Sequence, residues 1–215
     1  VDNTTTGANA VLQSSGLAPG DEVLVTSLGY GGVTRAVAHA AAASGATMRV
    51  VPLPGPGDAI TDDDAYVSPI VDAIGPHTRL LVVDHITSQS ALVLPVAAIA
   101  AACHARGVRV LVDGAHAPGS LPLDLPSLGA DWYIANLHKW AWTPRSAGIV
   151  WCAPEHRDTL HHPVASWGHG NGLAAEFDAP GTRDPTPFLA SPFAIDLLEA
   201  EGPGAVLAHN HALAC

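Results

Sequence analysis

The chain has 215 residues, of which 48% are apolar and only 13% are charged. Disordered chains are poor in apolar residues and rich in charge, so this composition predicts a folded core built mainly from Ala, Val and Leu. The net charge of −11 argues against a surface for nucleic acid or anionic membranes, because such surfaces need clusters of Lys and Arg. No apolar run approaches the roughly 20 residues of a membrane span.

Short apolar runs alternate with alanine-rich segments, which is typical of strands and helices in alternation. Strands that are almost entirely apolar favour a mostly parallel sheet covered by helices on both faces, so we expect one α/β domain over residues 1–215. In chain order we expect a helix after the threonine run near residue 4, strand 22–26, helix 35–43, strand 47–52, a helix from about 68 to 74, strand 79–85, helix 95–106, strands 109–113, 131–135 and 148–151, loops from 154 to 187, and helix 188–199.

The cysteines and histidines do not form a recognisable framework. Three scattered cysteines match neither a disulfide set nor a zinc motif, which predicts a reducing, cytoplasmic location. The histidines of the C-terminal part have spacings that fit no closed zinc site, so we interpret them as surface residues and expect no metal. They are His161, His162, His169, His209 and His211.

Lys139 is the only lysine among nine basic residues. Lysine can lose its proton and form a Schiff base, whereas arginine cannot. Trp140 and Trp142 flank it and would form a partly apolar pocket that lowers its pKa. An ordinary surface lysine is the alternative interpretation.

Two further features lie where a ligand of an α/β sheet is expected. Asp113 ends strand 109–113, at the sheet edge where such ligands bind, although it could instead cap the following loop. Near the start, Thr4, Thr5 and Thr6 precede an apolar helix pattern. Hydroxyls and free N–H groups at a helix N-terminus bind phosphate, but they also form an ordinary N-cap.

Together these residues are the parts of a pyridoxal-phosphate site. The Lys139 amine would bind the cofactor covalently, and the Asp113 carboxylate would keep the pyridine nitrogen protonated. His116 follows that carboxylate by three residues, and the helix start would hold the phosphate.

Seven segments, taken in order, resemble class V aminotransferase-fold enzymes. They are VDNTTTGAN, YGG, HITSQSALVLPV, VDGAHAPGSLPLDL, GADWYIANLHKW, TPRSAG and APGTRDPTPFLA. The likeness is strongest to the isopenicillin N epimerase-like branch, and the cysteine desulfurases are more distant relatives. The resemblance implies the large domain of a fold type I pyridoxal-phosphate enzyme, without the family's N-terminal segment and C-terminal small domain.

The resemblance also implies roles around the cofactor ring. Lys139 is the Schiff-base lysine, Asp113 pairs with the pyridine nitrogen, and His116 lies beside the ring near its phenolic oxygen. Ser88, or its neighbour Thr87, matches a position near the same oxygen.

Further residues match the family's phosphate and stacking positions. Tyr30 matches the aromatic residue stacked on the ring. Thr182 matches a segment that reaches the phosphate of the neighbouring subunit, which implies a homodimer with shared active sites. The phosphate contacts within the chain would be Thr4, Thr5, Thr6, Asn136 and His138.

The implied activity acts at the Cα of an amino-acid or amino-acid-containing substrate. We expect an epimerase of the isopenicillin N type, in which the freed Lys139 takes the Cα proton; the second acid is unassigned. A cysteine desulfurase or carbon–sulfur lyase is the alternative, followed by an aminotransferase. Cys103, Cys152 and Cys215 do not match the desulfurase nucleophile. The alternative of another class is a truncated, catalytically silent structural module.

Overall fold

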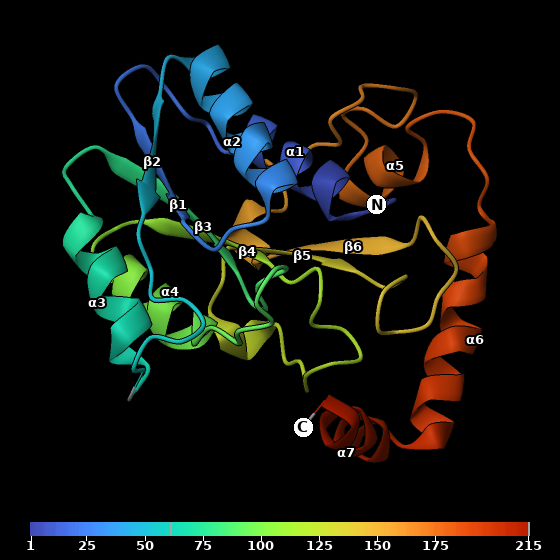
Figure 1. Ribbon diagram of the computed structural model, residues 1–215. Coiled ribbons are helices and arrows are strands. Elements are labelled where there is room, and N and C mark those ends of the chain that lie inside the picture. Colours follow the sequence, from blue (N-terminus) through green and yellow to red (C-terminus); the bar gives the residue numbers. More distant parts are fainter. Residues whose placement is uncertain (61, 215) are drawn as a thin grey trace.

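A six-stranded sheet forms the centre of the computed structural model, which describes residues 1–60 and 62–214 (Figure 1). The strands lie in the order β2-β1-β3-β4-β5-β6. Neighbours from β2 to β5 run parallel, and β6 runs antiparallel to β5. The mostly parallel sheet expected from the sequence is therefore confirmed. The strands are β1 (Glu22–Thr26), β2 (Thr47–Val51), β3 (Thr78–Asp84), β4 (Arg109–Asp113), β5 (Trp132–Asn136) and β6 (Gly148–Cys152).

Helices cover both faces of this sheet. Figure 1 shows α1, α2 and α5 above it and α3 and α4 below it, while α6 descends on the right and leads to α7. The helices are α1 (Thr4–Ser14), α2 (Gly31–Ser44), α3 (Asp64–Ala73), α4 (Val96–His104), α5 (Leu173–Asp178), α6 (Thr186–Glu201) and α7 (Pro203–Ala214), with short 3₁₀ turns at Pro126–Leu128 and Pro154–His156.

Two apolar layers fill the space between the sheet and its helices, because successive side chains of a strand point to opposite faces. Along β4, Val110 belongs to the same core as Ile99 of α4. The next residue, Leu111, belongs to the opposite core, together with Val11 of α1. Burial on both faces explains why the strands read as continuous apolar runs.

The structure differs from the sequence expectation by more than two residues in four helices. The α3 helix begins at Asp64 rather than near residue 68, and Pro69 lies inside it. The α2 helix begins at Gly31 rather than at residue 35, since its first turn contains Gly31 and Gly32. The α5 helix lies inside the segment expected to be loops, where six residues are too few for a periodic signal. The α7 helix was not expected either, and none of its described residues is buried.

None of the helices in the described part of the chain is long and apolar enough to cross a bilayer. Cys215 lies outside the described residues, and the other two cysteines are buried and free.

Candidate active site

Polar side chains collect where the parallel strands end. Strands β3 and β4 pair in register, so Asp84 lies beside Asp113, each as the last residue of its strand. Asn136 ends β5 in the same way, and the loop after it carries Lys139. The sequence-predicted residues therefore meet at the carboxyl edge of the sheet, where ligands of open α/β sheets bind.

Asp113 is buried, with only 2% of its surface exposed. Its Oδ1 accepts a hydrogen bond from the Ala115 N–H at 3.0 Å, whereas its Oδ2 has no partner among the described residues. Burial raises the pKa of Asp113 to about 6, and the Ala115 N–H and the Lys139 charge oppose the rise. A buried carboxylate oxygen without a partner needs a donor, and a protonated ring nitrogen is such a donor.

Asp84 is buried beside this carboxyl group. Its Oδ1 accepts the backbone N–H of Tyr30 at 3.3 Å. Burial, and then the negative charge of Asp113, raise the pKa of Asp84 to about 8. At neutral pH the pair of acids therefore carries one proton, held mainly by Asp84.

His116 lies between the only lysine and a tryptophan. The Trp140 indole N–H donates to His116 Nδ1 at 3.1 Å, so the proton of a neutral His116 ring is on Nε2. This Nε2 lies 3.0 Å from Lys139 Nζ. With the ring proton on Nε2, this contact favours the neutral amine of Lys139, which would accept through its lone pair. Burial lowers the pKa of Lys139, against the charges of Asp113 and Asp84, in the direction that its flanking tryptophans predicted.

Two glycines shape the loop that carries His116. A Cβ on Gly114 would overlap the Tyr133 ring, and one on Gly119, whose φ is 79°, would overlap the backbone of Trp140. The Tyr133 hydroxyl lies 2.8 Å from His85 Nδ1. Burial raises the pKa of Tyr133 and lowers the pKa of His85, so the phenol donates to a neutral imidazole. This buried pair supports the loop from within the core.

The threonine run forms the first turn of α1. The helix is capped by Asn3, whose Oδ1 accepts the Thr6 N–H at 2.9 Å. Asn136 accepts the Thr4 N–H at 3.0 Å and donates to the Thr4 hydroxyl at 3.3 Å. These bonds tie the turn to the end of β5 and leave Thr5 exposed. Asn136 thus orients the predicted phosphate turn through Thr4.

The remaining predicted residues occupy separate loops around this edge. Tyr30 precedes α2 and is 44% exposed. His138 lies on the Lys139 loop, where its Nδ1 donates to the Ala147 carbonyl at 2.8 Å. Thr182 is exposed, and the next residue, Arg183, forms an ion pair with Asp2 at 2.9 Å. The contact of Thr182 with a partner subunit stays a prediction.

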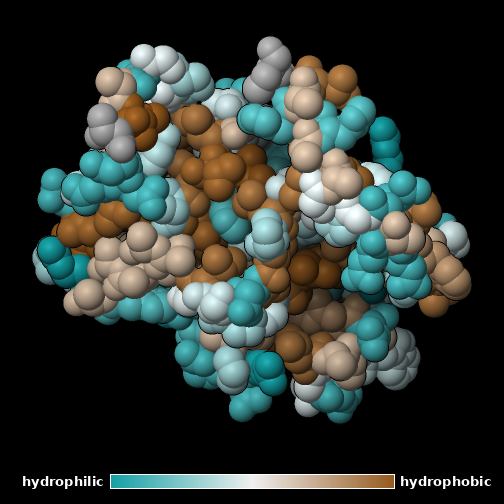
Figure 2. Space-filling view, turned by 90° about the horizontal axis from the view of Figure 1, so that it is seen from below, coloured by the Kyte–Doolittle hydropathy of each residue, from teal (hydrophilic) through white to brown (hydrophobic). Residues whose placement is uncertain are grey.

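Two adjoining hollows open at the reactive groups. One, of about 320 Å³, is lined by His116, Lys139 and Trp140. The other, of about 430 Å³, shares His116 and Trp140 and also contacts Ser88 and Leu207 of α7. Figure 2 looks at the molecule from below the sheet, where apolar side chains are exposed between polar ones. The site therefore has room for a ligand with both polar and apolar parts.

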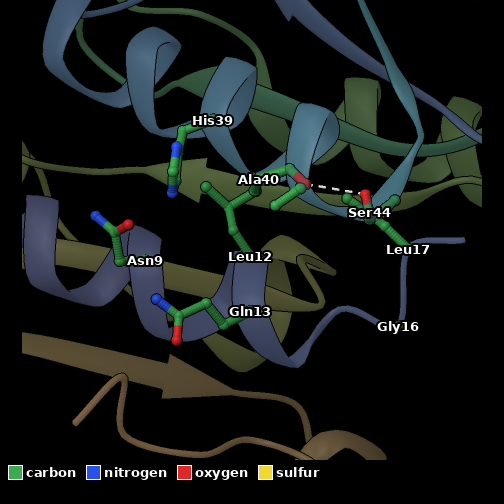
Figure 3. A pocket seen from close by; sticks show the side chains of 9 residues that line it. Asn9, Leu12, Gln13, Gly16, Leu17, His39, Ala40 and Ser44 are labelled. Carbon is green, nitrogen blue, oxygen red and sulfur yellow. Dashed lines mark hydrogen bonds between the residues drawn. The ribbon is translucent and has the colours of Figure 1, made fainter.

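A third hollow, of about 370 Å³, lies between α1 and α2 (Figure 3). His39 extends from α2 into the gap, and Ser44 donates to the Ala40 carbonyl at 2.9 Å. None of the sequence-predicted site residues lines this hollow.

Sequence reasoning missed part of the site. Asp84 gave a signal, since it ends a buried strand beside the one that ends in Asp113, but it received no role. The bonded pair Tyr133 and His85, which supports the His116 loop, gave no sequence signal, because its role depends on the close approach of Gly114 to the Tyr133 ring. The interpretation of the later histidines as surface residues is wrong for His162, which is buried and accepts the Val164 N–H at 3.0 Å.

Comparisons with known proteins place this arrangement in a family. The sequence profile described as aminotransferase class-V matches residues 1–214. The chain is 38% identical over 211 residues to the putative L-cysteine desulfhydrase 1 of Oryza sativa subsp. japonica, covering 92% of this chain and 44% of that protein. It is 33% identical over 227 residues to the isopenicillin N epimerase of Streptomyces clavuligerus, covering 98% of this chain and 56% of that protein.

A solved structure of a carbon–sulfur lyase is also similar to this chain. A cystine C–S lyase in complex with its reaction product, cysteine persulfide, superposes with a TM-score of 0.77 and 30% identity, over 94% of this chain and 55% of that one. The chain spans about half the length of the relatives it matches. The rice desulfhydrase shares more identical residues with the chain than the epimerase does, which reverses the order expected from the motifs.

Proposed function

The chain belongs to the class V aminotransferase family, and we propose on this basis that it contributes the cofactor-holding region of a carbon–sulfur lyase that acts on cysteine or cystine. The cofactor is pyridoxal 5′-phosphate. The observation that carries the proposal is the meeting, at one sheet edge, of a Lys139 amine favoured in its neutral form with the buried Asp113 Oδ2, for which the described residues offer no partner.

The residues at the sheet edge fit this cofactor. Asp113 Oδ2 would hold the proton of the pyridine nitrogen, which supplies the missing donor. Thr5, exposed at the start of α1, would contact the phosphate, where free N–H groups and the helix dipole favour an anion. Lys139 would hold the cofactor covalently. When bound, pyridoxal phosphate supplies an electron-accepting ring that stabilises negative charge at the substrate Cα.

The contacts of Lys139 suit it to move a proton. Once it is free of the cofactor, Lys139 as a neutral amine could take the Cα proton of the substrate. The resulting ammonium would face the N–H of His116, because Trp140 keeps the His116 proton on Nε2. Lys139 therefore does not retain the proton, which becomes available to another group.

In a lyase that group is the leaving sulfur. The Cβ–S bond would break with its electron pair departing on sulfur, and the proton from Lys139 would neutralise the leaving sulfur anion. With cysteine the products are hydrogen sulfide and, after addition of water, pyruvate and ammonia. With cystine the departing group is cysteine persulfide.

An isopenicillin N-type epimerase is the second candidate, supported by the alignment with the Streptomyces protein over 98% of this chain. An epimerase must return a proton to Cα from the opposite face of the ring. The higher identity to the desulfhydrase favours the lyase over the epimerase that the sequence motifs suggested.

The purified protein tests both parts of the proposal. It should be yellow, and borohydride should fix the cofactor to Lys139, as read by peptide mass. Incubation with L-cysteine or cystine should release pyruvate, together with sulfide or persulfide. Lys139→Arg should abolish both results, because a guanidinium stays protonated and does not act as the amine nucleophile.

Each outcome separates the candidates. Inversion of isopenicillin N at Cα without pyruvate from either sulfur amino acid would establish the epimerase. A colourless protein that takes up no added pyridoxal phosphate would contradict both enzyme candidates and favour the catalytically silent structural module.

A further inference from the structure

A second cluster of reactive side chains lies on the segment that joins β6 to α6. Glu176 of α5 is buried, with 4% of its surface exposed, and the imidazoles of two exposed histidines face its carboxylate. We propose that His161, His169 and Glu176 form a binding site for a divalent transition-metal ion of the zinc type. This site is separate from the proposed lyase chemistry.

The distances are close to those of a metal site. His161 Nδ1 lies 3.0 and 3.1 Å from the two oxygens of Glu176, and His169 Nδ1 lies 3.6 Å from Oε2. One donor atom from each residue lies within 4.8 Å of the other two. Donors on a tetrahedral zinc ion, each about 2.0–2.1 Å from the metal, are roughly 3.4 Å apart. The widest pair of donors would have to close by up to about 1.4 Å, and His161 would move slightly away from the carboxylate; both shifts are open to exposed imidazoles.

The chemistry of the donor set also fits. Imidazole nitrogen suits zinc, copper and nickel, and two histidines with one carboxylate leave a fourth position for water. The Glu176 carboxylate is held in place by two backbone groups. The N–H of Gly170 donates to its Oε1 at 3.0 Å, and the N–H of His162 donates to its Oε2 at 3.3 Å. Such bonds to the ligating groups orient them toward the metal.

An ion can reach this cluster from solvent. The side chains of His161 and His169 are 47% and 54% exposed. A hollow of about 230 Å³ adjoins His161 and the carboxylate, and its lining includes His161, Gly170 and Glu176. His161 is also anchored to α1, because its N–H donates to Ser14 Oγ at 2.9 Å. A bound ion would therefore link α5 to a loop that is fastened to the end of α1.

The site would stabilise the fold by binding the native state alone. Seven residues lie between the two histidines and six lie between His169 and Glu176, and this spacing matches no zinc motif. Only the folded loop brings the ligands together, so the unfolded chain offers no comparable site. At a hundredfold excess over its Kd, the ion should raise the Tm by roughly 5–10 °C.

Zinc titration of the chelator-treated protein, with its pyridoxal phosphate monitored by absorbance, tests the proposal. Calorimetry should give one ion per chain, and the Tm should rise. His169→Ala and His161→Ala should each weaken zinc binding at least tenfold and remove the Tm rise. His209→Ala is the matched control, since His209 is an exposed histidine of α7 outside the cluster, and it should bind zinc as the wild type does.

Two results would overturn the assignment. One is a wild-type protein with neither calorimetric binding nor a Tm shift. The other is binding that persists unchanged in His169→Ala and His161→Ala, which would locate the ion elsewhere. Because both readouts are independent of turnover, an inactive enzyme would leave this test intact.

Discussion

The amine nitrogen of Lys139 lies 3.0 Å from Nε2 of His116, whose other ring nitrogen is held by the indole N–H of Trp140. The indole can only donate, so it decides which imidazole nitrogen carries the proton. That choice makes the neutral amine the favoured form of the only lysine in the chain.

Replacing Trp140 by Phe tests this relationship. Trp140→Phe keeps an aromatic ring but removes the indole N–H, so His116 can move its proton to Nδ1 and accept from an ammonium. The pKa of Lys139 should rise, and covalent attachment of pyridoxal phosphate at neutral pH should slow by about tenfold for each unit of rise. The pH dependence of the attachment rate, followed by absorbance, measures the effect. Trp142→Phe, in the same loop, should leave the profile unchanged; equal profiles for both variants would disprove the role of the indole.

Asp113→Asn should separate cofactor attachment from turnover. Lys139 remains, so the protein should stay yellow, but an amide cannot hold the ring nitrogen's proton by ion pairing. We expect turnover of the sulfur amino acid to fall roughly 100- to 1,000-fold. Steady-state kinetics on cofactor-saturated protein check this, with the exposed Asp124→Asn as the control. Full turnover in Asp113→Asn would contradict the assignment.

Asp84 should make the stability of the cofactor-free protein depend on pH. Its pKa is raised in the folded state to about 8, so between about pH 4 and 8 the folded state holds a proton that the unfolded state has lost. The free energy of unfolding should therefore fall as pH rises through this range, by at most about 1.4 kcal/mol per pH unit. Denaturant unfolding at several pH values should show a flatter profile for Asp84→Asn. An unchanged slope in that variant would exclude Asp84 as the titrating group.

Gly114→Ala should destabilise the protein through its core. The new Cβ would overlap the buried Tyr133 ring, which is held by its bond to His85. Overpacking of this kind costs about 1–3 kcal/mol. Gly31→Ala is the control, because a Cβ there meets no atom within 4 Å. Comparable stabilities of the two variants in thermal unfolding would show that the loop relaxes around the added methyl group.

Thr182 tests the expected homodimer. It is exposed on the segment before α6, and a hydroxyl donated to a partner's phosphate would contribute roughly 1.5–3 kcal/mol. Pyridoxal phosphate should then stabilise the dimer, and Thr182→Ala should weaken both cofactor affinity and dimerisation. Sedimentation with and without cofactor measures this. A monomer that binds the cofactor with wild-type affinity would remove the shared site while leaving the Lys139 chemistry intact.

The sequence predicted the features that short segments determine. Strand β4, at Arg109–Asp113, has the expected bounds because a buried parallel strand is a short apolar run. Asp113 could be identified from the sequence because it is a polar residue at the end of such a strand. Lys139 could be identified because every other basic residue among the nine Lys and Arg residues is an arginine.

The rest of the site depends on distances between loops. The bond from Trp140 to His116 joins residues 24 positions apart, and that from Tyr133 to His85 joins residues 48 positions apart. No local pattern marks either pair. The cluster around Glu176 is similar, since the turn after β6 rather than any spacing brings its histidines together.

The register of β3 and β4 gives the sheet edge a preference for charge. Asp84 and Asp113 lie side by side, and an uncharged ring placed against them would leave Asp113 Oδ2 buried without a donor. A ring with a protonated nitrogen supplies that donor and pairs its positive charge with the Asp113 carboxylate. The edge should therefore distinguish planar ligands of the same shape by whether the ring atom facing Asp113 is a basic nitrogen. Analogues of the cofactor that carry a carbon at this position should bind weakly.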